Sequence, residues 1–222
     1  MPDSNVKYPM ADICVIFDLD GTLVDSEGLC NQAFLDTLPK LNESVESLTL
    51  RYRGKKLAPI LADIESRLCR KLPEAFEQDY RQRVTELFAS ELKPMSGVIE
   101  MLETINFPKC IASSGPLLKI RQALQVSGLA SYFGDNFFSA YEVGSWKPEP
   151  GLFQYAANAM GFTPSQCVVV EDSEVGIQAA TAAGMKAFRY VRNSEITPTI
   201  GSEVPFSDML QLPQLFACFV EN

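Results

Sequence analysis

Four short apolar runs, each followed by polar residues, set the strongest limit on what this chain can fold into. They are 13–17 (ICVIF), 110–113 (CIAS), 167–170 (CVVV) and 185–191 (MKAFRYV). Runs of this length are typical of buried strands, and helix-like segments lie between the later ones, at 116–127, 150–160 and 174–183. The tail, 205–216, predicts a last short strand or turn and then a helix capped by Ser207. Alternating strands and helices predict an α/β fold, a parallel sheet that binds ligands at the carboxyl ends of its strands.

The interval between the first two runs breaks this alternation. It contains no convincing strand, but apolar residues recur at helical spacing, at Phe76, Tyr80, Val84 and then Leu87 or Phe88. Pro94 suits the exit from the last helix of this interval. We therefore expect a small helical cap domain at 28–93, inserted into a core domain formed by 1–27 and 94–222.

Charge and cysteine spacing limit the classes of partner. The formal charge of −9 and the pI near 4.6 argue against nucleic acid or an anionic membrane surface, because both require a basic footprint. No stretch has the pattern of a signal peptide or the length of a membrane span. The six cysteines show no C-x-x-C spacing, so we expect reduced thiols and no structural zinc. These features predict a cytoplasmic protein. We also expect a monomer that acts on a small molecule.

The chain contains no histidine. This excludes the most common general base, the most common zinc ligand and every Ser-His or Cys-His nucleophile pair. Any catalytic chemistry must therefore use carboxylates, lysines and hydroxyls.

Two aspartates follow the first apolar run directly, in the stretch VIFDLDGTLVDS. Asp18 and Asp20 would repel each other at the end of a buried strand unless a cation or a phosphoryl group meets them there. An aspartate that attacks phosphorus needs a cation to screen the phosphate, and Mg²⁺ takes oxygen ligands of this kind. The second aspartate can protonate a leaving alcohol and later deprotonate water. The alternative is an Asp-Gly turn with both aspartates in solvent.

Later apolar runs are followed by further polar residues. Ser113 and Ser114 suit an anion-binding nest, or alternatively a plain helix N-cap. Lys147 offers a positive point charge to a phosphate, or is a solvated loop lysine. Glu171 and Asp172 suit the same cation as the first pair, or form an acidic helix N-terminus. On a parallel sheet, these strand ends would gather at one edge.

Taken in order, the motifs D-x-D-G-T, S-S-G, K-P and E-D resemble the four motifs of the haloacid dehalogenase superfamily of phosphotransferases, over nearly the whole chain. The resemblance implies a Rossmann-like core, Mg²⁺ as cofactor, Asp18 as nucleophile and Asp20 as general acid and base. Phosphate binding is implied for Ser113 and Lys147, and Ser114, in the predicted anion-binding nest, is a further substrate-binding candidate. Metal binding is implied for Asp18, Asp20, Glu171 and Asp172. The resemblance also implies a cis peptide bond before Pro148.

The helical insertion resembles the small cap of the β-phosphoglucomutase-like branch, in which the cap selects the substrate. The basic stretch RYRGKK (51–56) lies where that branch has its specificity loop, or is a solvated basic helix face. β-Phosphoglucomutases have a histidine where this chain has Cys30, so we expect hydrolysis rather than a mutase reaction. Asp20 disfavours dehalogenases and phosphonate-cleaving relatives, which lack the second aspartate.

Four segments resemble a bacterial 6-phosphogluconate phosphatase subgroup: ELFASELKPMSGV, SSGPLLK, FFSAYEVGSWKPEP and QLPQLF. This substrate carries a carboxylate at the end opposite its phosphate, and we expect Arg53 and Lys56 to pair with it, with Lys55 as an alternative. A phosphomutase, a broad-specificity sugar phosphatase and a non-catalytic binding module remain the alternatives.

Overall fold

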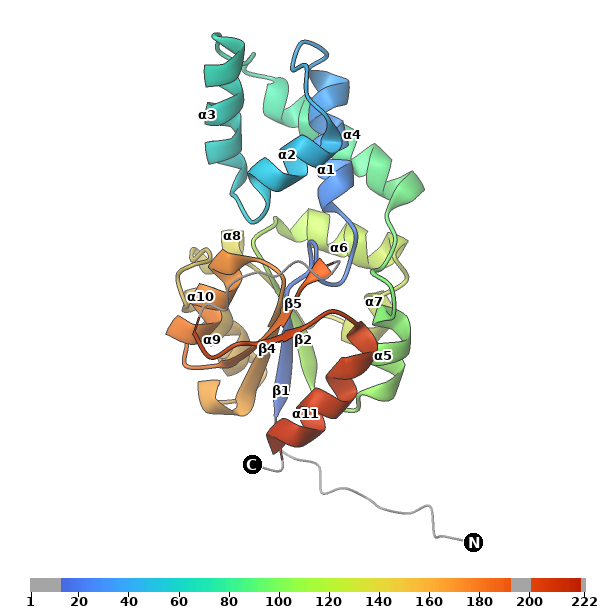
Figure 1. The fold of residues 1–222 in the computed structure, drawn as a ribbon, viewed down its shortest axis with the longest axis vertical. Coiled ribbons are helices and arrows are strands. Elements are labelled where there is room, and N and C mark those ends of the chain that lie inside the picture. The colour runs from blue at the N-terminus through green and yellow to red at the C-terminus, as the bar shows by residue number, and fades with distance from the viewer. Residues whose placement is uncertain (1–12, 193–200, 221–222) are drawn as a thin grey trace, which may run out of the picture.

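The computed structural model describes residues 13–192 and 201–220. Its six described strands form one parallel sheet in the order β3-β2-β1-β4-β5-β6 (Figure 1). Their bounds are β1 Cys14–Phe17, β2 Lys109–Ser113, β3 Phe137–Ser139, β4 Cys167–Glu171, β5 Lys186–Tyr190 and β6 Val204–Phe206. The chain order reverses direction beside β1, and this reversal places a crevice at the carboxyl ends of the central strands.

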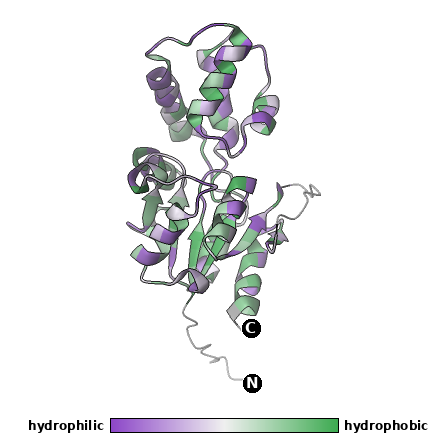
Figure 2. Ribbon diagram, turned by 90° about the vertical axis from the view of Figure 1, so that its left-hand side faces the viewer, coloured by the Kyte–Doolittle hydropathy of each residue, from purple (hydrophilic) through white to green (hydrophobic). Residues whose placement is uncertain are grey.

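The central strands are buried along their whole length, because helices cover both faces of the sheet. Along β1, Val15 and Phe17 join one hydrophobic cluster, whereas Cys14 and Ile16 join the cluster on the opposite face. This two-sided burial explains why the sequences of these strands are continuous apolar runs, coloured as hydrophobic in Figure 2. Cys14, Cys30, Cys69, Cys110 and Cys167 are free thiols, as predicted.

Helices form two groups around the sheet (Figure 1). Those that pack on the sheet are α5 Val98–Thr104, α6 Leu117–Val126, α7 Ala130–Phe133, α8 Ala140–Val143, α9 Gly151–Ala159, α10 Glu174–Ala182 and α11 Leu212–Val220. Those that lie beyond the carboxyl ends of the strands are α1 Glu27–Thr37, α2 Val45–Tyr52, α3 Leu57–Leu68 and α4 Phe76–Glu91. Among the described residues, no helix combines the length and the apolar character that crossing a lipid bilayer requires.

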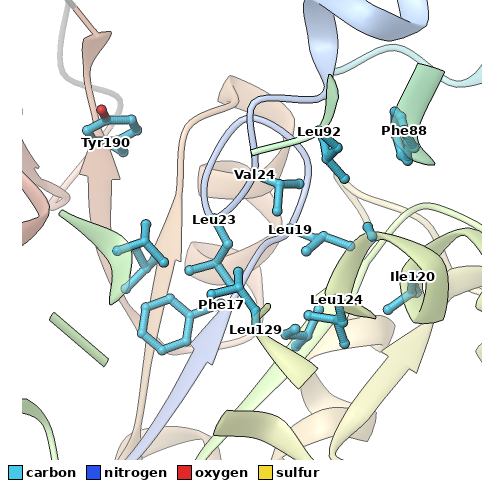
Figure 3. Packing of buried hydrophobic residues seen from close by; sticks show 14 of the residues in the cluster. Phe17, Leu19, Leu23, Val24, Phe88, Leu92, Ile120, Leu124, Leu129 and Tyr190 are labelled. Atoms are coloured by element: carbon cyan, nitrogen blue, oxygen red, sulfur yellow. The ribbon is translucent and has the colours of Figure 1, made fainter. Parts of the chain in front are cut away.

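The loop after β1 is anchored by apolar side chains. Leu19, Leu23 and Val24 are fully buried, in the same cluster as Phe17 and Ile120 of α6 (Figure 3). Because these buried side chains anchor the loop to the hydrophobic core, the polar residues between them are held at the carboxyl ends of the strands.

The α/β prediction is confirmed, and the four predicted strands correspond to β1, β2, β4 and β5. The prediction missed β3, a strand of three residues that is too short to give a period-two signal. The tail forms β6 and α11, but the predicted cap at Ser207 is wrong. Asp208 accepts a hydrogen bond from the Leu210 N–H at 3.0 Å and starts a short 3₁₀ helix, Met209–Gln211, before α11.

Candidate active site

Three charged side chains from separate segments form a buried cluster at the end of β1. Asp18, which follows Phe17, is only 6% exposed. Lys147 donates a hydrogen bond to Asp18 Oδ1, and its Nζ lies 2.7 Å from Glu171 Oε1. Burial raises the pKa of Asp18, and despite the opposing Lys147 charge the Glu171 and Asp20 carboxylates bring it to about 7. Burial alone would lower the pKa of Lys147, but the two carboxylates raise it, so the lysine stays charged.

Asp20 lies beside this cluster and has its own partners. Its Oδ1 accepts hydrogen bonds from Ser26 Oγ at 2.5 Å and from Lys119 Nζ at 2.8 Å. Burial alone would raise the pKa of Asp20, but Lys119 and Ser26 together hold it below its ordinary value. Lys119 reaches across from α6, and its Nζ lies 5.6 Å from the centre of the Phe88 ring. The structure therefore holds Asp20 in its ionised form.

Asp172 follows β4 and packs on the loop after β1. Its Oδ1 accepts a hydrogen bond from Thr22 Oγ1 at 3.1 Å. A Cβ on Gly21 would lie 2.7 Å from Asp172 Oδ2, and the φ of +88° at Gly21 also favours glycine. Burial and the Glu171 and Asp18 carboxylates raise the pKa of Asp172 well above its ordinary value. The acids at the ends of β1 and β4 therefore meet at one place, and their combined negative charge exceeds the positive charge of Lys147 and Arg192 beside them.

The segment after β2 forms a polar loop on the other side of β1. Ser113 Oγ accepts a hydrogen bond from the Gly115 N–H at 3.0 Å, and Ser139 Oγ donates to the Gly115 carbonyl at 2.7 Å. Ser114, which lies between Ser113 and Gly115 in the chain, is partly exposed. Pro116 is the N-cap of α6 and makes no side-chain cap hydrogen bond, so the plain-cap alternative for Ser113 is wrong. The loop keeps hydroxyl groups available at the sheet edge.

Glu171 is fixed on both of its oxygens. Oε1 pairs with Lys147, and Oε2 accepts a hydrogen bond from the Ser173 N–H at 2.5 Å. A Cβ on Gly176, in the first turn of α10, would lie 2.0 Å from Glu171 Cδ, so this glycine leaves the space that the carboxylate occupies. The Lys147–Pro148 peptide bond is cis, as predicted.

The site opens into a cavity of about 680 Å³ between the sheet edge and the α1–α4 group. All the residues predicted for the site line it, namely Asp18, Asp20, Arg53, Lys56, Ser113, Ser114, Lys147, Glu171 and Asp172. The structure thus brings together, in one cavity, residues from five separate parts of the chain.

The two cations predicted for the far end of the cavity already have contacts. Arg53 Nε lies 3.6 Å from Glu27 Oε2. Lys56 precedes α3, and its Nζ lies 5.0 Å from the centre of the Trp146 ring. Burial raises the pKa of Glu27, against the opposing charges of Arg53 and Arg192. The α1–α4 side of the cavity, called the insertion side below, therefore carries Arg53, whose charge Glu27 partly neutralises, and Lys56, which rests on the Trp146 ring.

Sequence reasoning did not assign a role to four residues that hold this site together. Lys119 and Ser26 bind Asp20, and Ser139 supports the loop after β2. Arg192, just beyond β5, donates a hydrogen bond to the Gly21 carbonyl at 3.1 Å. Arg192 could have been predicted from the sequence, because it directly follows the fourth apolar run, just as the predicted site residues follow the other three runs.

Comparison with known families identifies the chain. A family model for haloacid dehalogenase-like hydrolases matches residues 14–184, a range that includes all four motif segments. The chain belongs to the haloacid dehalogenase-like hydrolases. The 6-phosphogluconate phosphatase of Escherichia coli K12 is 35% identical over 207 residues, covering 91% of this chain and 93% of that protein. The fructose-1-phosphate phosphatase of the same organism is 30% identical, covering 78% of this chain and 93% of that protein.

Solved structures of this hydrolase family share the fold. A haloacid dehalogenase-like protein of unknown function from Agrobacterium tumefaciens has a TM-score of 0.79 and 31% identity, covering 93% of this chain and 98% of that one. A family hydrolase from Deinococcus radiodurans, solved with phosphate and sodium bound, has a TM-score of 0.76 and 25% identity, covering 95% and 98%. A putative β-phosphoglucomutase from Thermotoga maritima, 24% identical with a TM-score of 0.74 and covering 92% and 98%, supports the fold alone.

Proposed function

We propose that this hydrolase is a Mg²⁺-dependent phosphatase of small phosphorylated sugars or sugar acids, with 6-phosphogluconate as its substrate. The observation that carries the proposal is the buried cluster of Asp18, Lys147 and Glu171, with Asp20 beside it at the same sheet edge. The relatives named for phosphatase activity on 6-phosphogluconate and fructose 1-phosphate support the reaction class and the substrate class.

The reaction runs in two steps through an aspartyl-phosphate. Asp18 attacks the phosphorus, the bond between phosphorus and the sugar oxygen breaks, and the leaving alcohol takes a proton from Asp20. Asp20 then takes a proton from water, which attacks the phosphorus and releases inorganic phosphate and free Asp18. Asp20 keeps the proton that it takes from water and donates it to the leaving alcohol of the next turnover, so its protons balance over the cycle. The lowered pKa of Asp20 favours the base form that the second step needs.

Phosphate oxygens would be held by the polar loop after β2 and by Lys147. Ser113 and Ser114 supply hydroxyl groups, and the buried Lys147 ammonium supplies the compensating charge next to Asp18. Because both oxygens of Glu171 have protein partners, we propose that Glu171 acts mainly by orienting Lys147.

The residues at the sheet edge fit a Mg²⁺ ion. Within the described residues, no cluster of three or more His, Cys, Asp or Glu side chains forms a metal site. The carboxylates of Asp18 and Asp172 and the main-chain carbonyl of Asp20 would instead be the donors, an oxygen set of the kind that Mg²⁺ takes together with water and phosphate. The pKa values of Asp18 and Asp172 are raised by burial and by neighbouring carboxylates even though Lys147 acts on Asp18 and Arg192 on Asp172, so the negative charge at this edge exceeds the positive charge beside it. A bound Mg²⁺ ion would supply further positive charge and screen the phosphate from Asp18.

The α1–α4 side would select the substrate. We propose that 28–93 forms the cap domain and that Arg53 and Lys56, which line the cavity, contact the end of the substrate remote from the phosphate. The cytoplasmic location, the monomeric state and the lack of a nucleic acid or membrane partner remain predictions from the sequence.

Release of phosphate from p-nitrophenyl phosphate tests the proposal. We expect turnover that requires Mg²⁺, stops with a chelator and falls at least about 10⁴-fold in Asp18→Asn, because a covalent step is lost. A panel of phosphomonoesters should then rank 6-phosphogluconate first. A wild-type protein with no Mg²⁺-dependent turnover would contradict the proposal. Conversion of glucose 1-phosphate into glucose 6-phosphate without free phosphate would identify a mutase instead.

A further inference from the structure

Trp146 lies where the sheet edge meets the inserted helices. It directly precedes Lys147, and its ring faces Lys56, whose Nζ lies 5.0 Å from the ring centre. Both residues line the cavity. Within the described residues Lys56 pairs with no carboxylate, whereas Arg53 on the same loop faces Glu27. The aromatic ring is therefore the contact that places the Lys56 ammonium.

The ring itself is held from the sheet side. Trp146 packs on the hydrophobic cluster behind β1, and the Tyr141 ring meets it edge to face, with ring centres 5.5 Å apart and planes at 78°. The position of the Trp146 ring is thus fixed by residues of the core.

The loop that carries Lys56 has one further attachment to the sheet edge. A Cβ on Gly54 would lie 3.2 Å from Ser173 Cβ and 3.4 Å from Val175 Cγ2. The loop therefore contacts the start of α10, next to Asp172, through Gly54 and the Trp146 ring through Lys56. This path holds Lys56 over the same cavity as the acids.

We propose that Trp146 is a positioning residue that sets substrate preference: it holds the Lys56 ammonium in the cavity wall, ready to bind an anionic group at the far end of a phosphorylated substrate. This inference rests on the proposed phosphatase function. A cation fixed over an aromatic face loses little freedom when a carboxylate binds, and a ring within about 6 Å supplies the attraction that fixes it. The site therefore favours phosphorylated sugar acids over the matching neutral sugar alcohols.

Two substrates that differ at one end test this preference. 6-Phosphogluconate and glucitol 6-phosphate share the open chain and the phosphate, but only the first has a carboxylate. In Trp146→Leu and in Lys56→Met we expect the ratio of kcat/KM for the two substrates to fall at least about twofold to fivefold, the size of one exposed cation–π contact. The loss should lie in KM for 6-phosphogluconate, and Trp146→Phe, which keeps a ring, should restore part of the ratio.

Fluorescence gives a readout that does not depend on turnover. Trp146 is the only tryptophan of the chain, so its emission reports the contact directly. Lys56→Met should change the emission spectrum, whereas Lys40→Met, an exposed lysine of the same insertion outside the cavity, should not. An unchanged substrate ratio in Lys56→Met, or an emission spectrum equal to that of wild type, overturns the inference. Failure of wild type to hydrolyse p-nitrophenyl phosphate overturns the proposed function instead.

Discussion

The sheet side of the cavity is held by buried charges with several partners each, whereas the α1–α4 side presents an exposed lysine on an aromatic ring. Lys147 is 6% exposed and contacts both Asp18 and Glu171. Lys56, on the opposite wall, is exposed and rests on one aromatic ring. The two walls therefore differ in how much a single substitution can disturb them.

The sheet side therefore carries the residues proposed for catalysis, and the α1–α4 side carries those proposed for substrate selection. Removing one partner of a buried ion pair typically costs 3–5 kcal/mol, about three to ten times the typical value of an exposed cation–π contact. The wall that carries the proposed nucleophile should thus tolerate almost no change. Residues on the wall that faces the rest of the substrate can be substituted with little loss of stability. Substrate preference can therefore change while the residues proposed for catalysis stay the same.

The largest expected effect comes from Gly176→Ala on the sheet side. The new Cβ would lie 2.0 Å from Glu171 Cδ and Oε1, so the Glu171 carboxylate must leave its place beside Lys147. We expect the free energy of unfolding to fall by about 3 kcal/mol and kcat/KM for p-nitrophenyl phosphate to fall by more than about a hundredfold. Urea denaturation and steady-state kinetics measure the two effects.

Gly28→Ala is the matched control. It adds the same methyl group to a helix, and the nearest atom would be Val45 Cγ1 at 3.9 Å, an ordinary contact. We expect it to stabilise the protein by up to about 1 kcal/mol, because alanine favours helices more than glycine does. If Gly176→Ala behaves like Gly28→Ala, the sheet side is not the rigid wall described above.

A smaller loss is expected from Lys119→Met, which removes the cation that binds Asp20 at 2.8 Å but keeps the length of the side chain. We expect kcat to fall about tenfold to a hundredfold with little change in KM, because Asp20 acts on the reacting atoms and not on the rest of the substrate. Lys109→Met, at the opposite end of β2 from the site, is the control. An equal rise in KM for every substrate, with kcat unchanged, would instead assign Lys119 to phosphate binding.

The positions of the acids at strand ends could be read from the sequence because the signal is local. Asp18 and Glu171 stand at the ends of strongly apolar runs, and in a parallel sheet the ends of neighbouring strands must lie together. The same reasoning located Ser113 at the end of β2. No contact between distant residues had to be known for these predictions.

The supporting residues could not be predicted in this way. Lys119 lies on α6, 99 residues from Asp20 along the chain, and its direction depends on how that helix packs against the β1 loop. In the same way, Lys56 was expected to pair with the substrate carboxylate together with Arg53, and nothing local indicates that its ammonium rests on Trp146. Contacts of this kind depend on tertiary packing, which residue patterns along the chain do not encode.

The smallest expected effect comes from Gly54→Ala on the insertion side. Gly54 has a φ of +69°, where alanine is strained, and its Cβ would press on Ser173 at 3.2 Å. We expect the loop to lift from α10 and KM for 6-phosphogluconate to rise about threefold, with kcat for p-nitrophenyl phosphate nearly unchanged, since the catalytic edge is untouched. Gly161→Ala separates backbone strain from the contact, because Gly161 has a φ of +82° and no atom within 4 Å of its Cβ position. Both variants should lose about 1 kcal/mol of stability, but only Gly54→Ala should raise KM. Equal KM values in the two variants would mean that the loop contact with α10 does not shape the substrate site.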